Sequence, residues 1–367
     1  MNITFVTDSL GFGGAAKMIL FVARGMMQRG HEVKMINLNC FNAFDRMPED
    51  IETVSAHITY SGAIKTNYQV CKFVYDNAKR FKPDILVAFN NGSNFSAAIA
   101  GRLLHLPVIV SERADPFLSH KNPQFSVKVK QWFVAHADGT VFQSEGASMI
   151  YPEKLRRRST VIPNPITLTE QFTPIDYSKR PQTIVTHGRY DNKQKRYDVM
   201  LKGFSLFKQT HPDYKLIMYG TGSDESKIRD WVKELNLEDS VTINPITHTP
   251  MADISREGIY AITSDFEGIS NSLLEAMAVG MPVVCTDHSP GGGRLVVQDH
   301  QNGLLIPCGN PEAVANAFAE FADNPELAEK CGNSAKDVLV RFHPDKIMDM
   351  WESYINQVAD RFYGKTN

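Results

Sequence analysis

Residues 84–112, DILVAFNNGSNFSAAIAGRLLHLPVIVSE, carry the pattern that decides the fold of this chain. Apolar, largely β-branched runs at 84–89 and 107–112 predict two strands, and the segment between them has a helical period around 94–104. Parallel neighbouring strands require a helical crossover, so strand, helix and strand at this spacing predict a parallel βαβ unit. The stretch therefore predicts an α/β fold, with Glu112 at the end of a strand.

The same alternation covers the rest of the chain in two blocks. The first block has further expected strands at 3–7, 32–38 and 139–144, and expected helices at 15–28 and 124–136. Residues 161–182 are rich in proline and polar residues and lack periodicity, which is typical of an interdomain linker. The second block has expected strands at 183–189, 214–220, 240–244, 259–264, 282–287 and 303–307, and then helices at 312–323, 326–341 and 346–362.

The two blocks predict two domains. We expect the fold class α/β, with two Rossmann-like doubly wound domains that face each other across a cleft, and with ligands bound at the carboxyl ends of the strands. The first domain spans 1–168 and the second spans 169–345. We expect the helix at 346–367 to pack back on the first domain, because Trp351, Tyr354 and Ile355 share one of its faces.

Composition excludes several classes of protein. The chain has 367 residues, a formal net charge of -2 and 43% hydrophobic residues, so it is an ordered protein without a general attraction for nucleic acid. No window approaches the roughly 18 to 20 apolar residues of a membrane span, and the first residues lack the features of a signal peptide. Five cysteines, never in a C-x-x-C pair, indicate neither a disulfide framework nor a zinc site. We therefore expect a cytoplasmic protein with reduced thiols.

The turn at 11–16, GFGGAA, matches the G-x-G-x-x-A pattern of dinucleotide-binding folds. Such a site also needs an acidic residue at the end of the second strand, but residues 36–39 read INLN. The acidic residue that would also support NAD binding is therefore absent from the expected position. Gly13 and Gly14 still allow a backbone to approach a ligand, and a tight strand-to-helix turn without a ligand is the alternative.

Residues 264–282, SDFEGISNSLLEAMAVGMP, hold the strongest functional signal. Glu267 lies in the loop after a predicted strand, Gly268 allows a tight turn, and Ser270 or Asn271 can cap the helix that follows. The backbone N–H groups of residues 269–272 at the helix start can bind a diphosphate, and Glu275 on the second turn can accept from ribose hydroxyls. Glu267 would then hold the hydroxyls of a sugar. A capped surface helix is the alternative.

This segment resembles the E-x(7)-E signature of the retaining glycosyltransferases of family 4, which have two Rossmann-like domains in the GT-B arrangement. Residues 183–189, TIVTHGR, with Lys195 resemble the "GR...K" element, 220–222 resemble the "G-x-G" turn, and 302–305 resemble the "NGLL" strand. The resemblance covers nearly the whole chain. Residues 110–116, VSERADP, are similar to a stretch in bacterial members that extend polyprenyl-diphosphate-linked oligosaccharides or exopolysaccharide repeat units.

The resemblance implies roles for the two cations after the first strand of the second domain. It places Arg189 and Lys195 on the diphosphate of the donor, where the departing nucleoside diphosphate gains negative charge and needs a metal or fixed cations. No Asp-x-Asp stands at a strand end, so we expect no metal and no cofactor, the UDP-sugar being a substrate. Ordinary surface charges are the alternative for both residues.

The resemblance places the acceptor on the first domain. We expect Glu112, with Arg113 and Asp115 beside it, to contact the acceptor nucleophile or a transient oxocarbenium ion. A carboxylate that only pairs with Arg113 or Arg102 is the alternative. In the second domain, residues 291–295 read GGGRL where the family commonly has "G-G-P-R-E", so a sugar-selecting acid is missing there.

Two basic patches favour an acceptor at a membrane surface. One combines Lys121, Lys128 and Lys130 with aromatic residues at 125, 132 and 133, and the other is the run KLRRR at 154–158. Such surfaces can rest on anionic lipid or grip a lipid-linked diphosphate. A solvated basic face is the alternative. The patches leave open a peripheral position on the cytoplasmic face of the inner membrane.

We therefore predict a metal-independent, retaining hexosyltransferase that moves a hexose or N-acetylhexosamine from a UDP-sugar to a lipid-linked oligosaccharide or polysaccharide intermediate. The expected catalytic residues are Glu112, Arg189, Lys195 and Glu267. The expected donor-binding residues are Gly13, Gly14, Arg189, Lys195, Gly268, Ile269, Ser270, Asn271, Ser272 and Glu275. The expected acceptor-binding residues are Glu112, Arg113 and Asp115. The alternatives are a nucleotide-sugar epimerase or isomerase, an NAD-dependent oxidoreductase and a non-catalytic scaffold.

Overall fold

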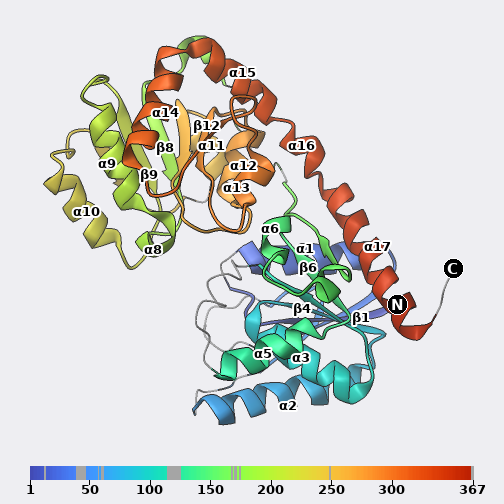
Figure 1. Ribbon diagram of the computed structural model, residues 1–367. Helices are drawn as coiled ribbons and strands as arrows, with labels where there is room; N and C mark the ends of the chain where they lie inside the picture. Colours follow the sequence, from blue (N-terminus) through green and yellow to red (C-terminus); the bar gives the residue numbers. More distant parts are fainter. Residues whose placement is uncertain are drawn as a thin grey trace. The chain divides into compact units, whose positions relative to one another are not determined.

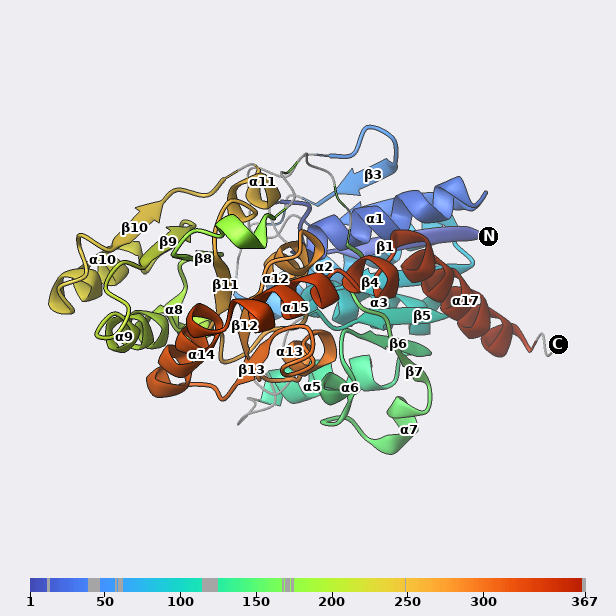
Figure 2. The same ribbon diagram turned by 90° about the horizontal axis from the view of Figure 1, so that it is seen from above.

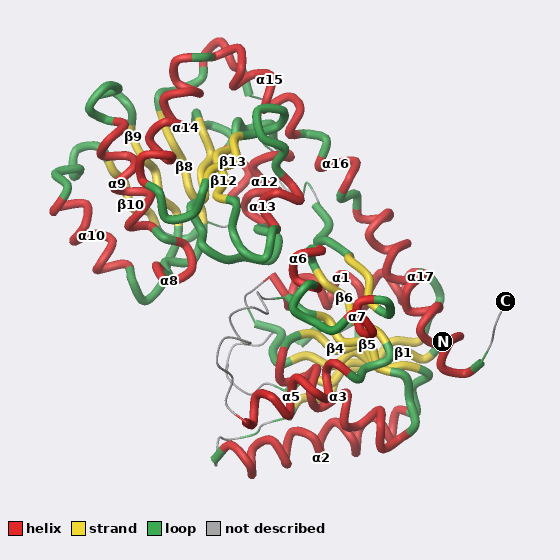
Figure 3. Tube along the Cα trace, in the orientation of Figure 1, coloured by secondary structure: helices red, strands yellow, loops and turns green. Residues whose placement is uncertain are grey.

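The computed structural model describes residues 1–11, 14–38, 47–56, 58, 62–113, 125–166, 168, 172, 175–247 and 249–364 (Figure 1). The chain divides into two compact units, the first formed by Met1–Asn164 with Asp345–Asn367 and the second by Pro165–Pro344. The sequence places the first boundary at 168 and the structure places it at 164. In each unit a central parallel sheet carries helices (Figure 3).

The first unit is built on a seven-stranded parallel sheet. Its strands are β1 (Asn2–Thr7), β2 (Glu32–Asn37), β3 (Glu52–Ser55), β4 (Ile85–Phe89), β5 (Val108–Ser111), β6 (Gly139–Phe142) and β7 (Ser159–Val161). Their order is β3-β2-β1-β4-β5-β6-β7, so the direction of winding reverses between β1 and β4. In such sheets ligands bind at the carboxyl ends of the strands beside this reversal.

Helices cover both faces of this sheet because alternate strand residues point to opposite sides. The helices are α1 (Gly14–Gln28), α2 (Ala63–Phe81), α3 (Asn91–Leu104), α5 (Phe125–Ala135), α6 (Glu145–Ser148), α7 (Glu153–Arg156) and α17 (Pro344–Tyr363). In β4, Ile85, Val87 and Phe89 join the core formed with α1 and α17. Leu86 and Ala88 join the core formed with α2 and α3.

Helix α17 completes the core of the first unit, as the sequence predicts. Its buried face carries Trp351, Tyr354 and Ile355, and the Trp351 ring stacks on Phe89 with centroids 5.4 Å apart. The Tyr354 hydroxyl accepts the N–H of Thr140 at 2.9 Å. Figures 1 and 2 show α17 beside α1. No helix in the described ranges is long and apolar enough to cross a membrane.

The second unit repeats the architecture with six parallel strands. They are β8 (Thr183–His187), β9 (Lys215–Tyr219), β10 (Val241–Asn244), β11 (Ile259–Ile262), β12 (Val283–Thr286) and β13 (Leu304–Ile306), in the order β10-β9-β8-β11-β12-β13. The helices are α8 (Asn192–Lys195), α9 (Tyr197–Phe207), α10 (Glu225–Glu234), α11 (Pro250–Ile254), α12 (Asn271–Ala278), α13 (Gly292–Val296), α14 (Pro311–Asp323), α15 (Pro325–Ala335) and α16 (Val338–Arg341). The predicted α/β class with two Rossmann-like domains is confirmed.

One predicted helix is wrong in its continuity. The expected helix at 326–341 is divided into α15 and α16 by a turn at residues 336–337. Cys331 on α15 packs into the core around α9 and α14, whereas Val338 on α16 packs into the core around α12. The chain passes from the first core to the second within α15, since Ala335 already packs into the core around α12, and the turn follows directly after this residue.

Candidate active site

The loops that follow β11 and β12 are joined at the carboxyl edge of the second sheet. The Glu267 N–H donates to the Ser289 carbonyl at 2.8 Å, and the Ser289 N–H donates to the Asp265 carbonyl at 3.1 Å. Gly292 at the start of α13 packs directly under the Gly268 carbonyl, and a Cβ there would lie 2.7 Å from the carbonyl carbon. The glycine-rich stretch therefore supports the loop that carries Glu267.

Lys195 and Glu267 form a buried ion pair in this loop cluster. The Lys195 ammonium contacts Glu267 Oε1, and the two side chains are only 14% and 9% exposed. The Ser264 hydroxyl donates to the same carboxylate oxygen at 3.2 Å. Burial acts to raise the pKa of Glu267, but the charge and hydrogen bond of Lys195 hold that pKa below its ordinary value. The structure thus brings together two predicted catalytic residues that are 72 positions apart.

Helix α12 begins beside this pair and carries the predicted donor-binding segment. Ile269 and Ser270 are buried, and the Ser270 hydroxyl lies 3.1 Å from that of Ser272 rather than capping the helix. The start of an α-helix is a favourable place for an anion because of the helix dipole and the direction of its first N–H groups. Glu275 lies on the second turn and is half-buried. Gly268 to Ser272 and Glu275 therefore form one continuous segment.

Arg189 lies in the loop between β8 and α8, whereas Lys195 is the last residue of α8, and the Arg189 side chain contacts other groups. Its guanidinium donates to Gln194 Oε1 at 3.0 Å and to Asp191 Oδ2 at 3.3 Å, and its side chain is 66% exposed. Behind it, the Tyr190 N–H donates to the Thr221 carbonyl at 2.9 Å, and a Cβ at Gly222 would lie 2.8 Å from the Tyr190 backbone nitrogen. The predicted "G-x-G" turn therefore packs against the backbone of the loop that carries Arg189 and leads into α8.

His288 is a member of this cluster that sequence reasoning missed. It is 1% exposed, its Nδ1 lies 3.4 Å from the Ser289 carbonyl, and within the described chain its Nε2 has no hydrogen-bond partner. Burial lowers the pKa of His288, and the neighbouring Glu267 charge opposes that shift. The only signal in the sequence is its place two residues after a strand end.

In the first unit, Glu112 is buried at the carboxyl end of β5. It is 6% exposed, Oε1 accepts from Asn94 Nδ2 at 3.1 Å, and Oε2 accepts from the Tyr151 hydroxyl at 3.4 Å. Burial raises the pKa of this carboxyl despite both hydrogen bonds. The alternative in which Glu112 pairs with Arg113 or Arg102 is wrong, since it makes no ion pair with any described residue.

Arg113 is a half-buried cation held by neutral groups. Its Nε donates to Ser111 Oγ at 2.8 Å and its Nη1 to Asn164 Oδ1 at 3.2 Å. The guanidinium lies 5.0 Å from the Phe89 ring centroid and 5.5 Å from that of Trp351. Burial lowers the pKa of Arg113 to about 9.

The remaining predicted positions of the first unit are Gly13, Gly14 and Asp115. Gly13 and Asp115 are outside the described residues, and Gly14 is the exposed first residue of α1. At the end of β2, Asn37 is buried and its Nδ2 donates to Ser55 Oγ at 3.2 Å. No acidic side chain is therefore present at the carboxyl end of β2 to hold the ribose of a dinucleotide, since the acidic residue of this strand, Glu32, is its first residue.

The basic patches of the first unit are partly engaged within the chain. Lys130 donates to Asn67 Oδ1 at 3.1 Å, and Arg157 pairs with Glu153 on the neighbouring turn. Trp132 remains 47% exposed, with the Arg102 guanidinium 5.7 Å from its ring centroid. Lys121 lies outside the described residues.

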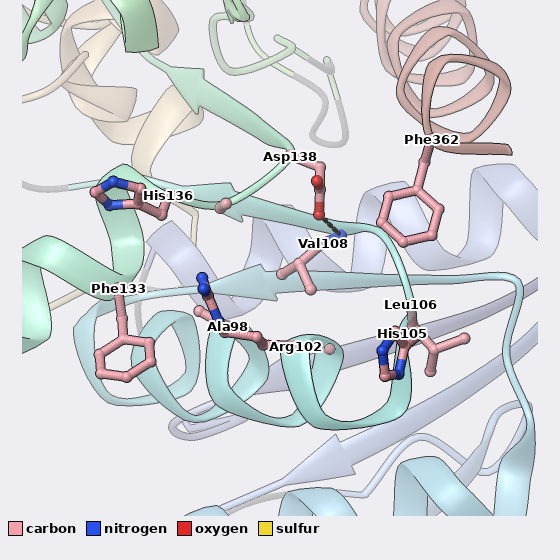
Figure 4. A pocket seen from close by; sticks show the side chains of 11 residues that line it. Ala98, Arg102, His105, Leu106, Val108, Phe133, His136, Asp138 and Phe362 are labelled. Atoms are coloured by element: carbon pink, nitrogen blue, oxygen red, sulfur yellow. Dashed lines mark hydrogen bonds between the residues drawn. The ribbon is translucent and has the colours of Figure 1, made fainter. Parts of the chain in front are cut away.

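A pocket of about 200 Å³ opens at the opposite, amino-terminal edge of the first sheet (Figure 4). Its lining includes Arg102, His105, His136, Asp138 and Phe362, and Asp138 Oδ2 accepts the N–H of Val108 at 3.0 Å. Arg102 in the last turn of α3 complements the dipole of that helix. This pocket contains none of the predicted site residues, so the candidate site is at the carboxyl edges.

Comparisons with known proteins cover both units. Residues 12–170 match the family model described as Glycosyltransferase Family 4, and residues 169–338 match the one described as Glycosyl transferases group 1. An uncharacterized glycosyltransferase of Haemophilus influenzae is 24% identical over 96% of this chain and 98% of its own length. A Campylobacter jejuni protein named GalNAc-alpha-(1->4)-GalNAc-alpha-(1->3)-diNAcBac-PP-undecaprenol alpha-1,4-N-acetyl-D-galactosaminyltransferase is 21% identical over 98% of this chain and 99% of its own length.

Solved structures share the architecture. Anabaena HepE in complex with UDP and glucose has a TM-score of 0.80 at 17% identity, covering 96% of this chain and 99% of that chain. The apo form of the lipopolysaccharide outer core galactosyltransferase WaaB has a TM-score of 0.78 at 20% identity, covering 97% of this chain and 99% of that chain. At these identities the similarity shows the fold.

Proposed function

Since the chain belongs to the glycosyltransferases, with a family 4 domain followed by a group 1 domain, we propose that it is a retaining enzyme with a UDP-sugar donor. The transferred group is a hexose or N-acetylhexosamine, and the acceptor is a lipid-linked oligosaccharide or polysaccharide intermediate. The observation that carries the proposal is the buried Lys195–Glu267 pair beside the start of α12. A cation, a carboxylate and a helix N-terminus at one strand edge suit a sugar diphosphate.

The proposed donor site works by exchanging the partner of Lys195. When the diphosphate binds at the start of α12, the Lys195 ammonium turns to it, and Glu267 becomes available to the sugar hydroxyls. A cation about 4 Å from a phosphate contributes on the order of 4 kcal/mol at an effective dielectric of about 20. This stabilisation grows as the sugar–oxygen bond breaks and charge collects on the leaving diphosphate, which is why it lowers the barrier.

We propose that the reaction needs no metal. Within the described residues no three His, Cys, Asp or Glu side chains gather around one point. Lys195 and the N–H groups of α12 supply positive charge instead, and Arg189 can join them by leaving Asp191. Glu275, one turn further along α12, accepts from the ribose hydroxyls.

We assign the acceptor to the first unit. Glu112 has a raised pKa because it is buried, which suits a group that accepts a proton or faces a developing positive charge. Arg113 offers a positive charge without a carboxylate partner among the described residues, which suits an anionic acceptor. The named acceptor of the Campylobacter jejuni relative is an undecaprenol-linked glycan. The name of this relative, the exposed Trp132 and the basic patches together support a location of the enzyme at the cytoplasmic face of a membrane.

Thermal unfolding with UDP, GDP or NADH, each with EDTA, tests the donor site. A ligand at about 100 times its dissociation constant adds about 2.7 kcal/mol of stability, which is readily measured. We expect stabilisation by UDP alone. Stabilisation by NADH alone would restore the dinucleotide interpretation, and loss of the UDP effect in EDTA would contradict the metal-free site.

Incubation of the enzyme with UDP-sugars separates the enzymatic alternatives. The proposed transferase releases UDP in the presence of a lipid-linked acceptor and retains the anomeric configuration in the product, which NMR of the new linkage reports. An epimerase or isomerase would convert the donor without an acceptor. A scaffold would bind UDP and give no turnover with any acceptor.

A further inference from the structure

Arg196 has a backbone conformation that its residue type disfavours. It follows Lys195 directly, between α8 and α9, with φ 53° and ψ 49°. Glycine adopts this left-handed conformation readily, whereas a residue with a side chain is strained in it. The side chain of Arg196 must therefore supply an interaction that glycine could not.

That interaction is a three-way ion pair. Nε and Nη2 donate to the two oxygens of Asp198 at 3.0 and 3.1 Å, and Nη1 donates to Asp265 Oδ2 at 2.7 Å. The three side chains are 27%, 19% and 33% exposed, so water screens them only in part. The two-pronged contact fixes the plane of the guanidinium, and the third bond reaches across to the loop after β11.

The backbone beneath the guanidinium is anchored to the same loop. The Thr263 hydroxyl lies 3.0 Å from the Lys195 carbonyl and 3.1 Å from the Arg196 carbonyl, and it shares its proton between them. The Asp265 N–H donates to the Gln194 carbonyl at 2.9 Å. The short helix α8 is therefore attached to the end of β11 at several points.

From this geometry we propose that Arg196 is a positioning residue that holds Lys195 and Glu267 in register for the donor diphosphate. Arg196 is one residue from Lys195, and its partner Asp265 is two residues from Glu267, so one guanidinium fixes both sides of the pair. The inference rests on the proposed donor site. In the proposed site Arg196 itself makes no contact with the substrate.

Replacement of Arg196 by glycine separates positioning from stability. Arg196→Gly relieves the left-handed strain while removing all three side-chain bonds, so we expect the thermal unfolding temperature to change little. Hydrogen bonds to charged groups correspond to roughly tenfold to a hundredfold in affinity, and Lys195→Ala should weaken UDP binding by that factor. We expect Arg196→Gly to produce most of the same loss, measured by isothermal titration calorimetry.

Three controls distinguish this role from a merely structural one. Affinity for uridine, which has no phosphate, should not change, because Arg196 acts through Lys195 on the diphosphate. In a Lys195→Ala background, Arg196→Gly should cause no further loss. Arg229→Gly, which removes the exposed ion pair with Glu225 on α10, should leave UDP affinity unchanged.

The possible results distinguish failure of the positioning role from failure of the donor site. If Lys195→Ala weakens UDP binding but Arg196→Gly does not, the positioning role is wrong and the donor site stands. If Arg196→Gly weakens UDP and uridine equally, or adds to Lys195→Ala, the residue supports the fold and not the lysine. If Lys195→Ala itself binds UDP normally, the proposed donor site fails and the role of Arg196 fails with it.

Discussion

Replacing Gly292 by alanine should displace the donor loop chiefly through its backbone, because the added Cβ meets the Gly268 carbonyl more closely than the His288 ring, whose Cε1 would be 3.1 Å away. The added Cβ would lie 2.7 Å from the Gly268 carbonyl carbon and closer still to its oxygen. Two carbon atoms in contact stand about 3.5 Å apart, so Gly268 must retreat by at least about 0.8 Å. Overpacking of this kind costs about 1–3 kcal/mol, and a misplacement of about 1 Å at a reacting centre costs on the order of a hundredfold in rate.

The neighbouring Gly291 provides the matched control. It has φ 94°, so alanine there is strained, but the nearest atoms to its Cβ are 3.6 Å or more away on the Arg294 side chain. We expect Gly291→Ala to lose about 1–2 kcal/mol of stability from backbone strain alone. Both variants should therefore unfold at lower temperature, and only Gly292→Ala should lose UDP binding and turnover.

The assay pairs UDP titration calorimetry with thermal unfolding of each variant. Gly292→Ala should bind UDP at least tenfold more weakly than Gly291→Ala at comparable stability, because loop position and not folding is the difference between them. Wild-type UDP affinity in Gly292→Ala would refute the reasoning. Equal losses in the two variants would show that general destabilisation, rather than the Gly268 contact, is responsible.

Further predictions concern single groups. Lys195→Ala should lower turnover by about two to three orders of magnitude if the ammonium stabilises the leaving diphosphate, and near-wild-type turnover would exclude that role. Glu112→Gln should abolish transfer with UDP affinity intact, and it should raise stability at neutral pH. Because burial raises the pKa of Glu112, the wild type loses stability as pH rises through the ordinary carboxyl range, and the advantage of the variant should vanish in acid. His288→Gln should show the opposite pH dependence. Because burial lowers the pKa of His288, the unfolded state binds the proton at a higher pH than the folded state does. The wild type should therefore lose stability as pH falls below about 6.5, and the variant should not. Neutralising the arginines at 156–158 should reduce sedimentation with anionic liposomes, and unchanged sedimentation would exclude that surface.

Strands with continuous apolar sequence were predictable, and the exceptions have a physical reason. Runs such as ILVAF at 85–89 are buried on both faces, so every residue contributes to the signal. The edge strand β3 reads ETVS and is only half-buried, which gives no such run. The helix at 63–81 was missed although its buried positions 70, 74, 78 and 81 have helical spacing, because most of its remaining residues are polar.

The site was predictable in its parts but not in its contacts. The sequence places Lys195 and Glu267 each after a strand, and parallel strands end at one edge, so their proximity could be expected. Which groups they meet depends on loop packing over long separations. The burial of His288, the left-handed Arg196 and the Tyr151 bond to Glu112 have no local pattern in sequence.

The placement of α17 affects the order in which the chain can fold during synthesis. The second unit is continuous in sequence, so it can fold as soon as it leaves the ribosome. Most of the first unit is synthesised earlier, but its core lacks Trp351 until the residues beyond Pro344 have been synthesised. Until then Phe89 has no Trp351 ring to stack on. A nascent chain therefore carries an unfinished apolar surface through the whole synthesis of the second unit. This surface is a natural binding site for a chaperone, and stop codons before residue 351 should yield aggregating rather than merely inactive protein.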